Sequence, residues 1–217
     1  AAALCGVHLS RLAEDMVLWS SAEFGFARMP DEFSTGSSLM PQKRNPDSME
    51  LLRGKAARFQ ASLTHLLTLT KGLPLTYNRD LQDDKPPLFD AADQLILSVA
   101  VADATLAGTK FHKARCLAAA SDPALLATDL ADWLVRKGMP FRHAHHAVGR
   151  LVALAEKSGV PLDKLSDVAA LTADKAFTKG WREVFSLQRG FAARENTGMP
   201  GPKAVAREIA RWKQSLR

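Results

Sequence analysis

The chain has 217 residues, of which 47% are hydrophobic and 24% charged, and its formal net charge is +6. This composition is ordinary for a soluble globular protein with a substantial core, and two cysteines are too few for a disulfide scaffold. The positive charge favours nucleic acid or a small anion as a partner. However, the basic residues are spread along the chain without interleaved aromatic residues, so we expect no nucleic-acid binding.

The chain opens with AAALCGVHLS, which carries no basic leader of the kind that begins a secretory signal. It also lacks an initiator Met and begins as if already inside a helix, so we expect its true N-terminal part to be missing. No apolar run approaches the ~18 residues of a membrane span, and we expect no membrane association. From about Leu4 to Ala27, apolar residues recur at three- and four-residue steps, which predicts the first helix.

Residues 34–47 read STGSSLMPQKRNPD, a polar loop interrupted by prolines. Asn45 is a suitable N-cap, and Pro46 suits the first position of a helix. The apolar pattern predicts that this second helix runs to about Lys71, where Gly72 follows and ends it.

A polar connection, LPLTYNRDLQDDKPP, precedes a third long helix predicted from about Leu88 to Thr109. Three long apolar helices without strand-like alternation predict an all-α protein, with residues 1–110 forming part of a helical bundle. From about residue 111 the predicted helices become shorter and are broken by Gly and Pro, so residues 111–217 form a smaller helical domain. Its last element is an amphipathic helix over Pro202–Arg217.

The 34–47 loop has a composition suited to binding anions. Gly36 and two serines offer backbone N–H donors just before a helix N-terminus, where the helix dipole attracts negative charge. Lys43 adds a positive charge and Asn45 an amide, so a carboxylate is a suitable ligand. A flexible surface loop ahead of a well-capped helix would have the same composition. The chain contains no G-x-S-x-G elbow, no S-x-x-K pair and no phosphate-binding P-loop.

GSSLMPQKRNP resembles the signature loop of the fumarase/aspartase superfamily, whose members release fumarate by elimination. Four further stretches are most similar to argininosuccinate lyases: HLSRLAEDMVLW, NPDSMELLRGKAAR, KGLPLTYNRDLQDDK and DLADWLVRKGMPFRHAH. The resemblance covers nearly the whole chain and is weakest after about Leu171. Those lyases commonly have Lys-Lys-Asn where this chain has Lys-Arg-Asn, with Arg44 in the middle, and adenylosuccinate lyases have Lys-Arg-Asn-Pro. Gln42 and the segment around Tyr77 favour the argininosuccinate lyases.

The resemblance implies a fumarase/aspartase-type bundle, a homotetramer in the cytoplasm with active sites shared between subunits, and no metal or organic cofactor. It implies cleavage of argininosuccinate to arginine and fumarate, with residues in three catalytic roles. Ser37 would be the base, Lys43 would hold the carboxylate that gains charge, and Glu50 would orient a histidine outside these 217 residues. The substrate would be bound by Asn45, Tyr77, Gln82 and Lys85. Because part of the site would lie elsewhere, we expect the chain alone to be inactive.

For several features, the residues alone leave a second interpretation open. Glu50 also reads as a solvated helix carboxylate. His143, His145 and His146 could suggest a metal site, but no third ligand for a shared face is evident, and a solvated helix face fits better. The tryptophans at three positions are expected to be core or packing residues: Trp133, Trp181 and Trp212. Two other classes remain open, a non-catalytic crystallin-like structural protein and an assembly module.

Overall fold

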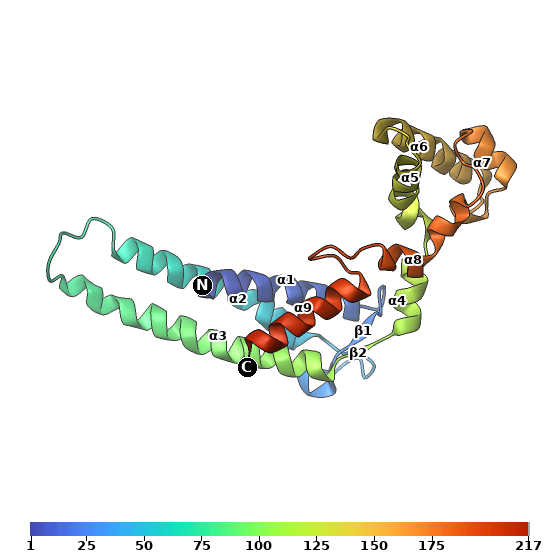
Figure 1. Ribbon diagram of the computed structural model, residues 1–217. Helices are drawn as coiled ribbons and strands as arrows, with labels where there is room; N and C mark the ends of the chain where they lie inside the picture. The colour runs from blue at the N-terminus through green and yellow to red at the C-terminus, as the bar shows by residue number, and fades with distance from the viewer. Residues whose placement is uncertain (217) are drawn as a thin grey trace. The chain divides into compact units, whose positions relative to one another are not determined.

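A computed structural model describes residues 1–216 and confirms the all-α prediction (Figure 1). The chain divides into two compact units, Ala1–Cys116 and Leu117–Arg217, and α4, Lys113–Ala120, contains the division. The domain boundary predicted at residue 110 lies in the short strand β2, Lys110–Phe111. Each unit has its own buried cluster of apolar residues.

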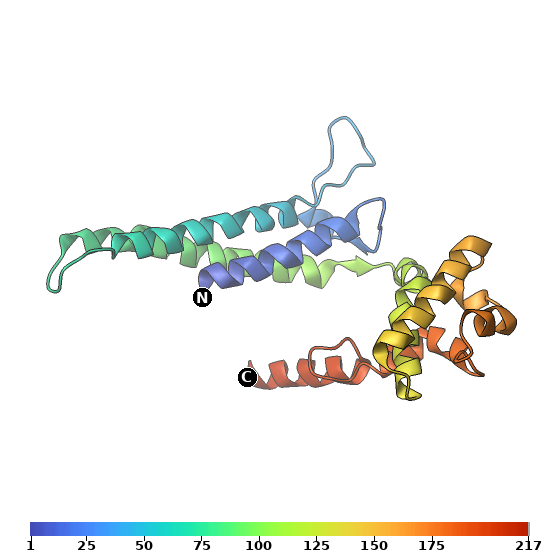
Figure 2. The ribbon, with the colours of Figure 1, turned by 90° about the horizontal axis from the view of Figure 1, so that it is seen from above.

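Unit 1 consists mainly of three long helices that lie side by side: α1, Ala2–Ser20; α2, Asp47–Leu69; and α3, Lys85–Gly108 (Figures 1 and 2). Its core is small and formed by Ala13, Met16, Ala27, Met29, Met49, Leu52 and Ala102. Gly6 allows α1 to approach α2 closely, because a Cβ at this position would lie 2.4 Å from Cδ2 of the buried Phe59 ring. The absence of a side chain at Gly6 therefore sets the packing of the two helices.

The first helix is shorter than predicted, because it ends at Ser20 rather than near Ala27. Gly25 adopts a φ of +56°, a region that favours glycine, and the chain reverses so that the Phe26 N–H donates to the Trp19 carbonyl at 2.8 Å. Ala27–Arg28 then form the strand β1, which pairs with β2 in antiparallel fashion. The apolar residues after Ser20 therefore belong to a turn and a strand.

The predicted N-cap of the second helix is wrong. The helix α2 begins at Asp47, Pro46 occupies the N-cap position, and no side chain caps the helix. The backbone of Asn45 instead forms an isolated bridge with Thr35, and its side-chain amide donates to the Gly36 carbonyl at 3.5 Å. Asn45 thus closes the loop rather than capping the helix.

The third helix begins earlier than predicted. The short helix η2, Arg79–Asp84, leads directly into α3, whose first turn contains the two prolines of KPP. Proline is tolerated there because the first N–H groups of a helix have no partner within it. The segment Arg79–Gly108 also contains an 18-residue window whose mean hydropathy of 1.3 and length would suit a membrane-crossing helix. This feature was not predicted, and a core helix of a soluble protein passes the same test.

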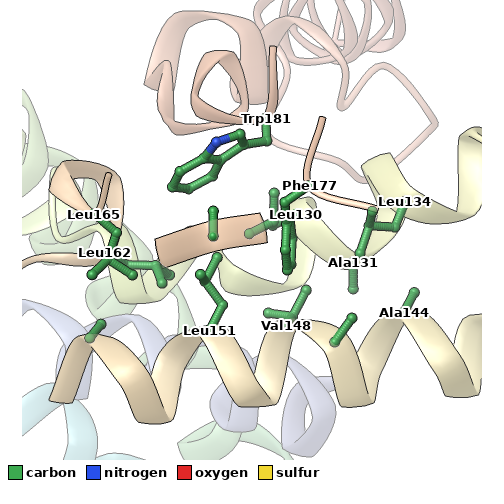
Figure 3. Packing of buried hydrophobic residues seen from close by; sticks show 13 residues of the cluster. Leu130, Ala131, Leu134, Ala144, Val148, Leu151, Leu162, Leu165, Phe177 and Trp181 are labelled. Carbon is green, nitrogen blue, oxygen red and sulfur yellow. The ribbon is translucent and has the colours of Figure 1, made fainter. Parts of the chain in front are cut away.

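Unit 2 is built from short helices around a second core. Its elements are η3, Pro123–Leu126; α5, Ala127–Arg136; α6, Phe141–Ser158; η4, Leu162–Lys164; α7, Asp167–Ala173; η5, Trp181–Phe185; α8, Leu187–Ala192; and α9, Pro202–Ser215. Figure 3 shows Leu151 of α6 pointing toward the cluster that contains Leu130 and Trp181. Glycines at positive φ, such as Gly159 at the end of α6, end the helices near the predicted breaks.

The three tryptophans expected to be core or packing residues differ in burial. Trp181 is 1% exposed and belongs to the core of unit 2, and its indole N–H donates to Asp167 Oδ1 at 3.0 Å. Trp133 is partly buried against the same core. Trp212 is 57% exposed and is therefore not a core residue, although the guanidinium of Arg211 lies over its ring. Ala204 at the start of α9 is buried, whereas Val205, Ile209 and Trp212 on the same helix are exposed.

Candidate functional site

The loop of residues 34–47, hereafter the signature loop, is closed at its base by two pairs of contacts. The backbones of Thr35 and Asn45 exchange hydrogen bonds of 3.1 and 2.8 Å. The Thr35 hydroxyl donates to Asp47 Oδ2, which lies in the first turn of α2. In addition, Arg44 forms an ion pair with Asp31 of η1, Asp31–Phe33. The loop therefore leaves the body of unit 1 and returns to it at a fixed point.

Ser37 lies within this closed loop, and its hydroxyl oxygen accepts two backbone hydrogen bonds. The N–H of Leu39 donates to Ser37 Oγ at 3.2 Å, and the N–H of Met40 donates at 3.1 Å. Two N–H donors aimed at one oxygen stabilise negative charge on it, as in an oxyanion hole. The arrangement suits a serine that must act as an alkoxide base.

Lys43 and Asn45 lie on the returning arm of the same loop. The Lys43 N–H donates to the Met40 carbonyl at 3.0 Å, which forms a turn, and the Lys43 side chain is exposed. A Cβ at Gly36 would meet nothing within 4 Å, so the opposite arm leaves open space. The structure thus places Ser37, Lys43 and Asn45 in one loop, which offers a hydroxyl group together with cationic and amide donors for a carboxylate.

Glu50 lies in the first turn of α2, next to the end of the signature loop. Its side chain is exposed. The pKa of Arg53 is raised, chiefly by its hydrogen bond to Glu14 of α1, and the negative charge of Glu50 adds a smaller effect. Glu50 therefore acts on a network that joins α1 to α2, and its carboxylate remains open to a further partner.

Tyr77, Gln82 and Lys85 lie at the opposite end of unit 1, in the connection between α2 and α3 and at the start of α3 (Figures 1 and 2). The 23 residues of α2 separate the two groups by about 34 Å at 1.5 Å per residue. Tyr77 is 80% exposed, and Lys85 Nζ lies 2.9 Å from Asp84 Oδ1. Within a single chain, the structure does not bring these three residues to the signature loop.

The connection before Tyr77 contains a strained residue. Thr76 has a φ of 105°, which costs a β-branched residue about 1–2 kcal/mol. The side-chain amide of Asn78 holds this conformation by donating to the carbonyls of Pro74 at 2.8 Å and Thr76 at 3.1 Å. The backbone that presents Tyr77 is therefore fixed by local contacts.

The histidine run lies on α6, where His145 contacts the rings of Phe141 and His146. Among residues 1–216, no three His, Cys, Asp or Glu side chains gather as metal ligands. The contact between Thr35 and Asp47, which closes the signature loop, was not predicted from the sequence. Their positions at the two ends of the polar loop were the available signal.

Comparisons with known proteins bear on the fold and on the kind of protein this chain resembles. A family described as "Argininosuccinate lyase C-terminal" matches residues 124–191, and a family described as "Lyase" matches residues 1–61. Argininosuccinate lyase of Roseiflexus sp. (strain RS-1) is 55% identical over 215 residues, covering 99% of this chain and 47% of that protein. Argininosuccinate lyase of Chloroflexus aurantiacus (strain J-10-fl) is 53% identical, covering 100% of this chain and 47% of that protein. Over nearly all of its residues, the chain is similar to argininosuccinate lyases.

The chain spans about half the length of these relatives, 47% of each. The chain is also similar to a solved structure of an EDDS lyase variant with bound fumarate. The TM-score is 0.84 at 28% identity, covering 99% of this chain and 44% of that chain. The fold is that of the fumarase/aspartase superfamily, to which the argininosuccinate lyase family belongs. The resemblance predicted from the signature loop is confirmed.

Proposed function

We propose that the protein is an argininosuccinate lyase, which cleaves argininosuccinate to arginine and fumarate in the cytoplasm as the last step of arginine biosynthesis. The observation that carries this proposal is the Ser37 hydroxyl with its two N–H donors. It occurs in a chain that is 53–55% identical to argininosuccinate lyases. Two free cysteines, Cys5 and Cys116, suit a reducing compartment.

In the proposed mechanism Ser37 removes the proton from the carbon next to a substrate carboxylate. That carboxylate gains charge as the proton leaves, and Lys43 stabilises it, with Asn45 binding beside it. The electron pair then forms the double bond of fumarate, and the carbon–nitrogen bond to the arginine moiety breaks. The leaving nitrogen needs a proton, and we assign it to a histidine outside these residues that Glu50 orients.

We also propose that the active protein is a homotetramer whose sites combine residues of different subunits. Two observations support this. First, Tyr77, Gln82 and Lys85 lie about 34 Å from the signature loop of their own chain. Second, the long helices expose large apolar side chains that a bundle would bury: Leu4, Val7, Leu51, Leu63, Leu67, Leu88, Phe89, Ile96, Leu97 and Val99.

The test follows fumarate release by ultraviolet absorbance, using the protein at the full length of its relatives. Argininosuccinate and adenylosuccinate are supplied separately. We expect fumarate from argininosuccinate, and we expect Ser37→Ala or Lys43→Ala to lower kcat at least ~10²-fold with folding intact. Ser34→Ala is the matched control, since its hydroxyl donates to the Pro30 carbonyl at 3.0 Å and keeps away from the loop interior.

Other outcomes would assign the protein elsewhere. Fumarate from adenylosuccinate would make it an adenylosuccinate lyase and would give Arg44 the greater weight. No fumarate from either substrate, with a folded tetramer by size-exclusion chromatography, would favour a structural or assembly role. Near-normal turnover in Ser37→Ala would remove Ser37 as the base.

A further inference from the structure

Unit 1 contains a pocket next to the base of the signature loop. Its volume is about 290 Å³, and it lies between the end of α1, the β1–β2 pair and residues 44–46. Its lining contains three arginines, one histidine, three serines and one asparagine, and among the described residues that form it none is acidic. Ser37 and Lys43, which the proposed lyase chemistry uses, are outside this lining, whereas Asn45 belongs both to it and to the proposed substrate-binding residues.

Arg115 lines this pocket from an exposed position and packs against the turn at Gly25. A Cβ at Gly25 would lie 2.4 Å from Arg115 Nη1, so the guanidinium packs directly against the turn, which Gly25 makes possible at φ +56°. Arg115 Nη2 also lies 3.4 Å from the carbonyl oxygens of Ala22 and Glu23. Hydrogen bonds from its own backbone N–H and then from Ser21 lower the pKa of Glu23, so this carboxylate belongs to the turn. The Arg115 guanidinium therefore has a defined position and retains N–H donors that can bind a ligand.

Arg28 stands in an unfavourable position unless negative charge is nearby. The register of the β1–β2 pair places it directly opposite Lys110, and like charges directly opposite each other destabilise a strand pair. Asp31 is 3.8 Å from Arg28 Nη2, but the same carboxylate pairs with Arg44. One acidic side chain therefore serves two guanidinium groups and leaves an excess of positive charge.

We propose that this pocket binds a small dianion, either an inorganic oxyanion such as phosphate or a dicarboxylate. Planar guanidinium groups such as those of Arg28 and Arg115 bind carboxylate and phosphate oxygens in bidentate fashion. The volume of about 290 Å³ suits a ligand of a few heavy atoms, at the lower end of small-molecule sites. The dianion supplies negative charge beside Arg28, whose cross-strand neighbour Lys110 lies outside the lining.

Binding here would also reach the signature loop. Arg44 and Asn45 line the pocket, and both belong to the returning arm of that loop. A dianion that contacts Arg44 draws this arm toward β1 and adds to the attachment made by Asp31. Anion binding in the pocket therefore adds to the ordering of the signature loop, and the anion concentration sets how much of the protein is in this form.

The experiment measures binding of inorganic phosphate by calorimetry, at constant ionic strength, to the protein at the full length of its relatives. Arg28→Gln and Arg115→Gln should each weaken phosphate binding about 10-fold, the effect of removing one charge-assisted donor pair. Arg11→Gln is the matched control: it removes the same charge from the exposed face of α1 in the same unit and should leave binding unchanged. Lys43→Ala should also leave it unchanged.

The outcomes separate this proposal from the lyase proposal, because calorimetry with phosphate needs no turnover. Equal phosphate binding by Arg28→Gln and wild type would overturn the proposal. A loss of binding in Lys43→Ala as large as in the arginine variants would also overturn it, because it would place phosphate in the signature loop. Arg28 is half exposed, so Arg28→Gln remains informative if Arg115→Gln fails to fold. Displacement of phosphate by fumarate would identify a dicarboxylate site, and its absence an oxyanion site.

Discussion

Replacing Thr35 with Val should loosen the signature loop while keeping its size and the Asp47 carboxylate. The hydroxyl of Thr35 donates to Asp47 Oδ2, and the backbone bridge to Asn45 remains without it. A hydrogen bond to a charged group contributes about 1.5–3 kcal/mol, and we take about 1 kcal/mol because the Thr35 side chain is exposed. In the proposed mechanism Ser37 acts from the closed loop, so kcat/KM should fall about 5-fold.

The assay is fumarate release from argininosuccinate, by ultraviolet absorbance, with the protein at the full length of its family. Thr35→Ser is the control, because it retains the hydroxyl and should keep wild-type kcat/KM. An unchanged kcat/KM in Thr35→Val would refute the role of the side-chain contact. A loss in Thr35→Ser as large as that in Thr35→Val would assign the effect to the lost methyl group instead.

Two further predictions concern stability. Gly6→Ala should lower the free energy of unfolding by about 1 kcal/mol, because its methyl group would meet the buried ring of Phe59. Gly54→Ala, with nothing within 4 Å, should raise it by about 1 kcal/mol, and equal effects of the two in urea unfolding would contradict the close approach of α1 and α2. The pKa of Asp167 is lowered, first by the hydrogen bond from Trp181, so its stabilising contribution is present above about pH 3.8 and is lost as the pH falls through the lower folded value. Acid unfolding of Asp167→Asn, followed by tryptophan fluorescence, should show a weaker dependence on pH in this range, and an unchanged acid transition would argue against this role.

Most of the architecture follows from local patterns in the sequence. Apolar residues at three- and four-residue steps predicted three long helices, and glycines such as Gly159 marked the ends of the short helices in unit 2. The first helix was predicted too long, because its true end depends on the pairing of β1 with β2. That pairing joins residues more than eighty positions apart, and a pattern along the chain does not report it.

The candidate site was predicted only in part. The composition of the signature loop indicated an anion, and the resemblance supplied the roles of Ser37 and Lys43. The two N–H groups that point at Ser37 Oγ depend on the backbone path through Leu39 and Met40, which side-chain identity does not determine. The pocket with Arg28 and Arg115 also depends on long-range pairing, and therefore only the structure revealed it.

The donors to Ser37 have a consequence for how this loop tolerates mutation. They are main-chain groups, so exchanging Leu39 or Met40 for another side chain leaves them in place. Proline is the exception, since it has no N–H, and Leu39→Pro or Met40→Pro would delete one donor each. A saturation library at these two positions should therefore tolerate chemically diverse residues and reject proline, so chemical similarity of side chains would be a poor guide to damage there.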